Sequence, residues 1–225
     1  MATKALKSKG ATHTGVIPPV SLRRPATETL VPSTALYRVF TQPPKTADRT
    51  LAFNPHSNGR ASPVQDKAGN VDPAMYVSVG TQEGAVLEML YHEVLKKHRK
   101  GSVLLASTLN RLLIVELVVK KPLVLASMPA LEDTGFIMPS FDLPRKDSYA
   151  DTQADAQRVY TKYAKCSGLF WLSARGPAVA AVLYQSRTPK GALAAIGKAE
   201  PVRDHPVWDY VREVLAFHEI RLVEK

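Results

Sequence analysis

Three side chains of different chemistry lie close together in the sequence: an arginine, a tyrosine and a glutamate. Arg60 lies in a loop-like stretch, Tyr76 in the strand-like run 75–79, and Glu88 in the helical pattern that follows. A guanidinium binds phosphate through paired hydrogen bonds, and a phenol ring offers a flat apolar face. This combination suits a ligand that contains both phosphate and a flat ring. We therefore expect the rest of the chain to hold these three side chains around one hollow.

Glu88 lies at the border of the apolar stripe of its helix. Leu87, Leu90, Tyr91 and Val94 follow the i, i+3, i+4, i+7 spacing of a core-facing stripe. Glu88 is about 100° from Leu87 around the helix axis, where a carboxylate can line a cleft. The alternative is a solvated surface glutamate, which is the commoner fate of a charged residue.

Arg38 is a second candidate for binding an anion. It alternates with Leu36 and Phe40 in the strand-like run 35–40. A guanidinium on that apolar face needs an anionic partner, because an unpaired buried charge is expensive. The alternative is that Arg38 lies at a strand end and reaches water.

Arg60 belongs to a long connection, residues 41–74, that is rich in proline and shows no sustained period. Long connections of this kind are uncommon in compact domains and often bind ligands. Gly59 would let the backbone approach a ligand while the guanidinium of Arg60 grips it. The alternative is a surface excursion with a solvated Arg60.

Ser173 lies in a polar turn between two apolar runs, 168–172 and 178–184. A hydroxyl there can contact a ligand or bond its own backbone. No metal site is expected. His92-Glu93 lacks a second histidine at position 96, and the single cysteine, Cys166, allows no internal disulfide.

The charge of the chain is uneven. The net charge is +10, and five cations precede the first acid, Glu28. A basic surface of this kind allows a nucleic acid, an anionic small molecule or an acidic protein as partner. The longest apolar run, Leu112–Val119, is interrupted by Glu116 and falls short of the roughly 18 residues of a membrane span. We expect it to be a buried strand.

Strand-like and helix-like stretches alternate along the chain. Helices are expected from Gln82, from Ser148 and over 206–215. The strand-like runs are 35–40, 75–79, 108–119, 123–126, 168–172, 178–184 and 220–222. This order is typical of α/β or α+β folds with a mixed sheet. We predict one compact α+β domain with flanking helices over residues 34–225, after a flexible basic leader over residues 1–33.

The ordered set of motifs resembles the RES domain family, the toxin halves of bacterial RES–Xre toxin–antitoxin pairs. The resemblance covers roughly residues 35–187, and the segments that carry it are 37–39, 58–60, 76–78 with Glu88 and His92, 149–153 and 168–175. The sequence departs from the family in two respects. Ala61-Ser62-Pro63 stands where an aromatic residue and asparagine usually follow the loop arginine, and the gap to Tyr76 is longer than usual.

The resemblance implies an ADP-ribosyltransferase-like fold and an enzyme that consumes NAD by hydrolysis or phosphorolysis. A protein ADP-ribosyltransferase is the alternative within the same fold, and a non-enzymatic basic binding module is the alternative outside it. The implied active-site residues are Arg38, Arg60, Tyr76, Glu88 and Ser173. Glu88 would stabilise the cationic ribose, the arginines would hold phosphate, Tyr76 would orient the nicotinamide, and Ser173 would bond the ribose or amide.

The resemblance also implies partners and a location. NAD would be a substrate, and no cofactor or metal is expected. The chain would bind a cognate Xre-like antitoxin and reach nucleic acid only through it. We expect a cytoplasmic protein with no membrane partner, and self-association is left open.

Overall fold

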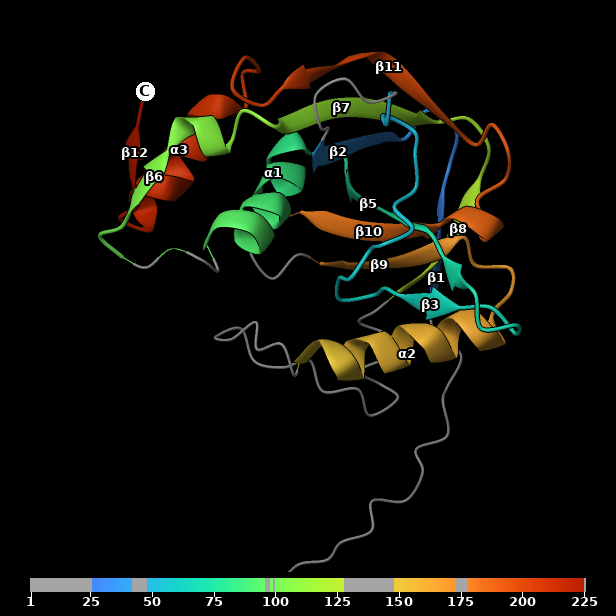
Figure 1. Ribbon diagram of the computed structural model, residues 1–225. Coiled ribbons are helices and arrows are strands. Elements are labelled where there is room, and N and C mark those ends of the chain that lie inside the picture. The colour runs from blue at the N-terminus through green and yellow to red at the C-terminus, as the bar shows by residue number, and fades with distance from the viewer. Residues whose placement is uncertain are drawn as a thin grey trace, which may run out of the picture.

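The computed structural model describes residues 26–41, 48–95, 98, 100–127, 148–172 and 178–224 (Figure 1). Within them, eight strands form one sheet in the order β1-β8-β9-β10-β5-β2-β7-β11. Their bounds are β1 (Thr27–Leu30), β2 (Ala35–Thr41), β5 (Ala74–Val79), β7 (Leu112–Val119), β8 (Leu123–Ser127), β9 (Gly168–Leu172), β10 (Val179–Tyr184) and β11 (Leu193–Pro201). The pair β8–β9 is parallel and the other pairs are antiparallel, so the sheet is mixed.

The sheet is strongly curled. Strands β7 and β8 are far apart in the strand order, yet only residues 120–122 join them. The curl encloses an apolar inner face, which includes Leu36, Leu117, Leu125 and Leu183, each with no exposed surface. Burial of this face stabilises the fold through the hydrophobic effect.

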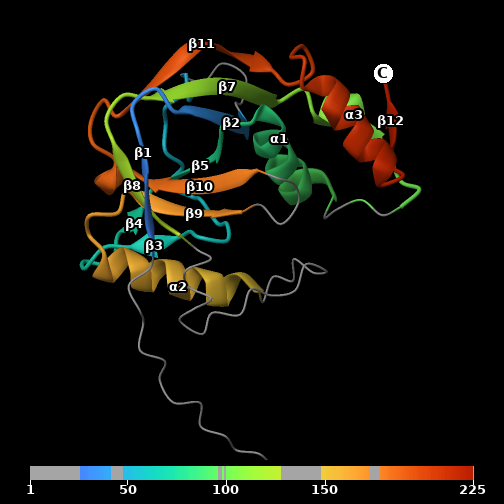
Figure 2. The same ribbon diagram turned by 180° about the vertical axis from the view of Figure 1, so that it is seen from behind.

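Helices cover two separate parts of the outer face (Figures 1 and 2). Helix α1 (Gln82–Leu90), with the π-helical turn Tyr91–Leu95 after it, packs in one apolar cluster with α3 (Trp208–Phe217). A small parallel sheet of β6 (Val103–Leu105) and β12 (Arg221–Val223) adjoins this cluster. Helix α2 (Ser148–Lys162) packs under the sheet, beside the hairpin of β3 (Val64–Gln65) and β4 (Val71–Asp72).

The predicted α+β fold with a mixed sheet is confirmed. The first helix begins at Gln82, as predicted, and Leu87, Leu90 and Val94 of its stripe are buried. Thr81 occupies the position before this helix, but its side chain forms no capping hydrogen bond. The Thr81 hydroxyl lies 3.3 Å from that of Ser78 instead.

Several expectations about irregular segments are corrected. Strand β1 lies inside the leader predicted for residues 1–33, and it pairs with β8, so the sheet begins at Thr27. The residues before position 26 lie outside the described part of the chain. The connection 41–74 contains the β3–β4 hairpin, and β7 begins at Leu112 rather than at Thr108. No helix among the described residues is long and apolar enough to cross a membrane.

Candidate active site

Arg60, Tyr76 and Glu88 line one cavity of about 210 Å³. The other lining residues are Tyr37, Val39, Asn54, Ser57, Asn58, Gly59, Val77, Ala85, Met89, Trp171 and Ala180. The loop arginine, the strand tyrosine and the helix glutamate therefore meet, although they come from three different elements. Their chemical roles remain predictions.

Strand register explains how the outer face of the sheet supplies one wall of this cavity. Tyr37 of β2 pairs with Ser78 of β5, Ser78 pairs with Ala180 of β10, and Ala180 pairs with Trp171 of β9. Side chains of directly paired residues lie on the same face of a sheet. This row across four strands therefore lies on one face of the sheet, and its members Tyr37, Trp171 and Ala180 line the cavity.

Helix α1 lies close above this row because Gly84 has no side chain. A Cβ atom at Gly84 would lie 2.5 Å from the Cβ of Ala178 and closer still to the hydroxyl of Ser78. The glycine lets the first turn of α1 approach the sheet. Glu88 and Met89, just over one turn later, then line the cavity from above.

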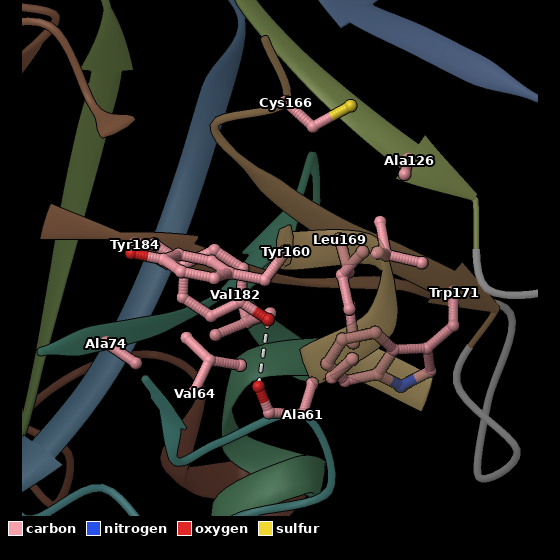
Figure 3. Close-up of a cluster of buried hydrophobic side chains, with 13 residues drawn as sticks. Ala61, Val64, Ala74, Ala126, Tyr160, Cys166, Leu169, Trp171, Val182 and Tyr184 are labelled. Atoms are coloured by element: carbon pink, nitrogen blue, oxygen red, sulfur yellow. Dashed lines mark hydrogen bonds between the residues drawn. The ribbon is translucent and has the colours of Figure 1, made fainter. Parts of the chain in front are cut away.

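The Arg60 loop is held by hydrogen bonds with two tyrosines, the half-buried Tyr76 and the buried Tyr184. The Tyr76 hydroxyl accepts a bond from the Ala61 amide at 3.1 Å and lies 3.0 Å from the Ser62 hydroxyl. Tyr184, which is 1% exposed, donates to the Ala61 carbonyl at 2.9 Å (Figure 3). A buried polar group that loses its hydrogen-bond partner raises the free energy of the folded state. These bonds therefore fix the backbone just after Arg60, at Ala61 and Ser62.

Gln153 of α2 fixes the same loop from below, and the sequence did not predict this role. Its amide nitrogen lies 2.8 Å from the carbonyls of Gly59 and Ser62 and 3.1 Å from Oδ1 of Asn58. One side chain thereby joins the residues that flank Arg60. A polar residue on a helical border is ordinarily solvated, so no sequence signal separated Gln153 from its neighbours.

The ring of Tyr76 packs between the loop and the sheet. A Cβ atom at Gly59 would lie 2.7 Å from Cζ of Tyr76, so only glycine allows this approach. The ring meets Trp171 edge to face, with centroids 6.2 Å apart and planes at 71°. Tyr76 thus positions the Arg60 loop through its hydroxyl. The predicted orientation of a nicotinamide ring by Tyr76 stays a prediction.

Arg38 is 7% exposed and lies between Leu36 and Phe40 on the inner face, as the alternation predicted. The expected anionic partner is not found among the described residues. The Nη1 atom of Arg38 donates instead to the carbonyls of Arg49 at 3.0 Å and Thr50 at 2.7 Å. Burial, and to a smaller extent the charge of Arg49, lower the pKa of Arg38 to about 10.

Arg38 and Arg49 line a second cavity of about 310 Å³, which adjoins the first. No acid is found among the described residues that line it, and the two cavities share Val39, Asn54, Ser57, Tyr76 and Met89. Desolvation and the like charge of Arg49 both raise the free energy of the charged form of Arg38 in this cavity. An anion in the second cavity would relieve that cost.

Comparison with known proteins now identifies the family. The sequence model of the RES domain matches residues 35–210. This chain belongs to the RES domain family. The fold is similar to that of a chain in the crystal structure of the M. tuberculosis MbcT–MbcA toxin–antitoxin complex, with a TM-score of 0.54 and 18% sequence identity. The match covers 75% of this chain and 84% of that chain. No curated protein sequence matches.

The departure of this RES chain after its loop arginine has a structural counterpart. Ala61 has no exposed surface and packs in the cluster that contains Trp171. Ser62 is 1% exposed, and its hydroxyl lies 2.8 Å from that of Ser57 as well as near Tyr76. The buried methyl group of Ala61 and the hydrogen bonds of the Ser62 hydroxyl therefore hold the loop in this chain.

Tyr37 is a further residue of the RES fold that the sequence did not assign to the site. Burial and the nearby carboxylates of Glu116 and Glu83 raise its pKa, so its phenol stays neutral at the wall of the cavity. Ser173 lies outside the described residues, as does the side chain of His92. Within the described part of the chain, no group of three His, Cys, Asp or Glu side chains could hold a metal ion.

Proposed function

We propose that this RES chain is an NAD-cleaving enzyme and the toxin of a toxin–antitoxin pair. The observation that carries the proposal is the shared cavity of Arg60, Tyr76 and Glu88. A cavity with a carboxylate, a guanidinium and aromatic walls suits a ribose that bears a flat ring and a phosphate. The match to the RES domain over residues 35–210 supports the same assignment.

The proposed reaction breaks the bond between nicotinamide and ribose. The bonding electron pair leaves with the nicotinamide nitrogen, and positive charge develops on the ribose, as in glycoside hydrolysis. Glu88 would stabilise that charge and bind the ribose hydroxyls. An acceptor oxygen then bonds to the ribose carbon and loses its proton. Trp171 and Tyr37 form the aromatic walls beside the leaving ring.

The two adjoining cavities would divide the dinucleotide between them. The cavity with Glu88 would take the nicotinamide ribose, and Arg60 at its edge would bind the pyrophosphate. The described lining of the cavity with Arg38 and Arg49 contains two arginines and no acid, which favours a second anionic group of the substrate or a phosphate acceptor. Shared lining residues make the two spaces contiguous.

The proposed partner is an antitoxin that covers the cavity. The structural relative comes from a toxin–antitoxin complex, which motivates this part of the proposal. An Xre-like antitoxin would then supply the inhibition, and both proteins would act in the cytoplasm. A size-exclusion assay of the co-expressed pair tests whether the antitoxin binds, and titration of NAD cleavage tests whether it blocks the cavity.

The decisive experiment follows nicotinamide release from NAD by the purified chain. The Glu88→Gln variant should lose turnover while its melting temperature stays within a few degrees, because a half-buried border residue costs little to change. Glu83→Gln is the matched control, since Glu83 lies on the same helix and lines neither cavity. Full activity of Glu88→Gln, or equal losses in both variants, would remove the proposed role.

The same assay identifies the acceptor. Release that rises with phosphate indicates phosphorolysis, and phosphate-independent release indicates hydrolysis. Transfer of label from NAD to protein, without free ADP-ribose, would indicate a protein ADP-ribosyltransferase instead. Absence of NAD cleavage under all three conditions would refute the enzymatic proposal.

A further inference from the structure

Five exposed lysines gather at the end of the curled sheet where three connections meet. They are Lys120 and Lys121 between β7 and β8, Lys162 at the end of α2, Lys165 between α2 and β9, and Lys190 between β10 and β11. We call this group the lysine end. The three connections lie together at the right of Figure 1 and at the left of Figure 2.

Hydrogen bonds show that two of these connections are in direct contact. The Lys121 ammonium donates to the Lys190 carbonyl at 2.8 Å, and the Lys120 amide donates to the Ala192 carbonyl at 2.7 Å. The β7–β8 turn therefore lies directly against the β10–β11 connection.

The α2–β9 connection is joined to the same place. The Ser167 amide donates to the Val124 carbonyl at 2.7 Å, at the start of β8. Arg187 of the β10–β11 connection donates to the Tyr163 carbonyl at 3.0 Å, between Lys162 and Lys165 in the sequence. Neighbouring strands are separated by about 4.8 Å, so the lysine end extends over roughly 15 Å of surface.

The segments that form the lysine end carry no acid of their own. The segments 120–122, 162–167 and 185–192 contain no acidic residue. Among the described residues close by, Asp72 is 5% exposed, and its carboxylate already accepts bonds from Tyr160 and Ser186.

Some surface cations elsewhere form ion pairs with acids. The salt bridges between described residues are Lys100–Glu219, Arg158–Asp155, Arg203–Glu224 and Arg212–Asp209, and none includes a lysine of the lysine end. Three of these four pairs involve α3 or the segments beside β6 and β12, which lie away from the lysine end (Figure 1). Within the described part of the chain, the five lysines of the lysine end therefore form no ion pair.

We infer that the lysine end binds the phosphate backbone of duplex nucleic acid, independently of the cavity. Lysine ammonium groups bind phosphates without reading sequence, and release of counterions supplies the free energy. Single-stranded nucleic acid is a poorer fit, since its binding relies on exposed aromatic rings for base stacking. The aromatic residue of these connections, Tyr163, is half-buried. Direct contact of this kind goes beyond the expectation that the antitoxin alone reaches nucleic acid.

The test is binding of the full chain to a fluorescent 20-base-pair duplex of arbitrary sequence, measured by anisotropy over a salt series. Each lysine–phosphate contact contributes about −0.9 to the slope of log K against log salt. A variant with all five lysines of the lysine end changed to glutamine should bind at least tenfold more weakly at low salt. Its slope should be shallower by roughly 3 to 5.

A matched control removes five cations elsewhere: Lys100, Lys198, Arg203, Arg212 and Arg221, each changed to glutamine. This control has the same net charge as the test variant. Its affinity for the duplex and its salt slope should stay within about twofold of those of the unchanged chain. Equal weakening in both variants would show that only total charge matters, and that would overturn the inference. Unchanged binding in the test variant would place the contact elsewhere, including the basic residues before position 25, and would overturn it too.

Two competitors test the class of partner. If the inference is correct, polyglutamate of equal charge should displace the duplex poorly, and a single strand should bind more weakly than the duplex. Tighter binding of either competitor would assign the surface to an acidic protein or to single strands, and would refute the proposal. Nicotinamide release by the test variant should match that of the unchanged chain, so failure of the enzymatic proposal is recognised separately.

Discussion

Gln153 and Gln157 offer a controlled test of how the Arg60 loop is positioned. Both glutamines lie on α2, one turn apart, and both bond a segment of the connection before β5. Gln153 reaches Gly59 and Ser62 on either side of Arg60. Gln157 accepts from the Gln65 amide at 2.7 Å and donates to its carbonyl at 2.9 Å, in the β3–β4 hairpin.

The size of the effect follows from the hydrogen bonds. The Gln153 amide has two protons, so it satisfies two acceptors fully even though three lie within reach. Each net hydrogen bond contributes about 0.5–1.5 kcal/mol, so Gln153→Ala should cost roughly 1–3 kcal/mol. If that free energy maintains the position of Arg60 in the transition state, kcat/KM for NAD should fall roughly 5- to 150-fold.

Gln157→Ala removes a comparable number of bonds but touches a hairpin outside both cavities. We expect a similar loss of stability, measured by urea unfolding, with kcat/KM reduced less than twofold. The assay is initial-rate nicotinamide release at several NAD concentrations, combined with the unfolding curve of each variant. Equal effects of the two substitutions on kcat/KM would refute the reasoning, because Gln153 would then be merely structural.

Three further predictions concern the Arg60 loop and the tyrosines that support it. Arg60→Lys should lower kcat/KM at least tenfold with little change in melting temperature, since an ammonium lacks the paired donors of a guanidinium; wild-type kinetics would contradict this. Gly59→Ala should destabilise the chain by about 1–3 kcal/mol in urea unfolding, because its Cβ collides with the ring of Tyr76. Burial raises the pKa of Tyr184 well above 10, so stability should be constant up to about pH 10 and fall as the pH rises further; Tyr184→Phe should show a weaker fall in alkaline unfolding curves.

Hydrophobic periodicity was sufficient for six of the eight strands of the large sheet, namely β2, β5, β7, β8, β9 and β10. The alternation of Leu36, Arg38 and Phe40 predicted both the strand β2 and the face that it buries. The border position of Glu88 was compatible with either a cleft residue or a solvated one, and the structure places it at a cavity wall. These patterns work because strand and helix periods depend on local geometry.

The parts that the sequence did not predict depend on contacts between distant segments. Strand β1 is short and exposed, so it carries no alternation, and only its pairing with β8 defines it. The edge strand β11 is interrupted by a register shift between Ile196 and Glu200. The carbonyl partners of Arg38 come from a turn whose position is set by tertiary packing.

The full burial of Ala61 limits how this protein can be recombined with its relatives. The methyl group of Ala61 packs with Trp171 and Val182 in a filled core, so the aromatic residue that the family resemblance implies at this point would overfill it (Figure 3). A loop transplanted alone from a relative should therefore misfold locally, whereas a chimera that also exchanges the underlying strands and α2 should tolerate it. The loop can therefore be exchanged between relatives only together with the strands and the helix that pack beneath it.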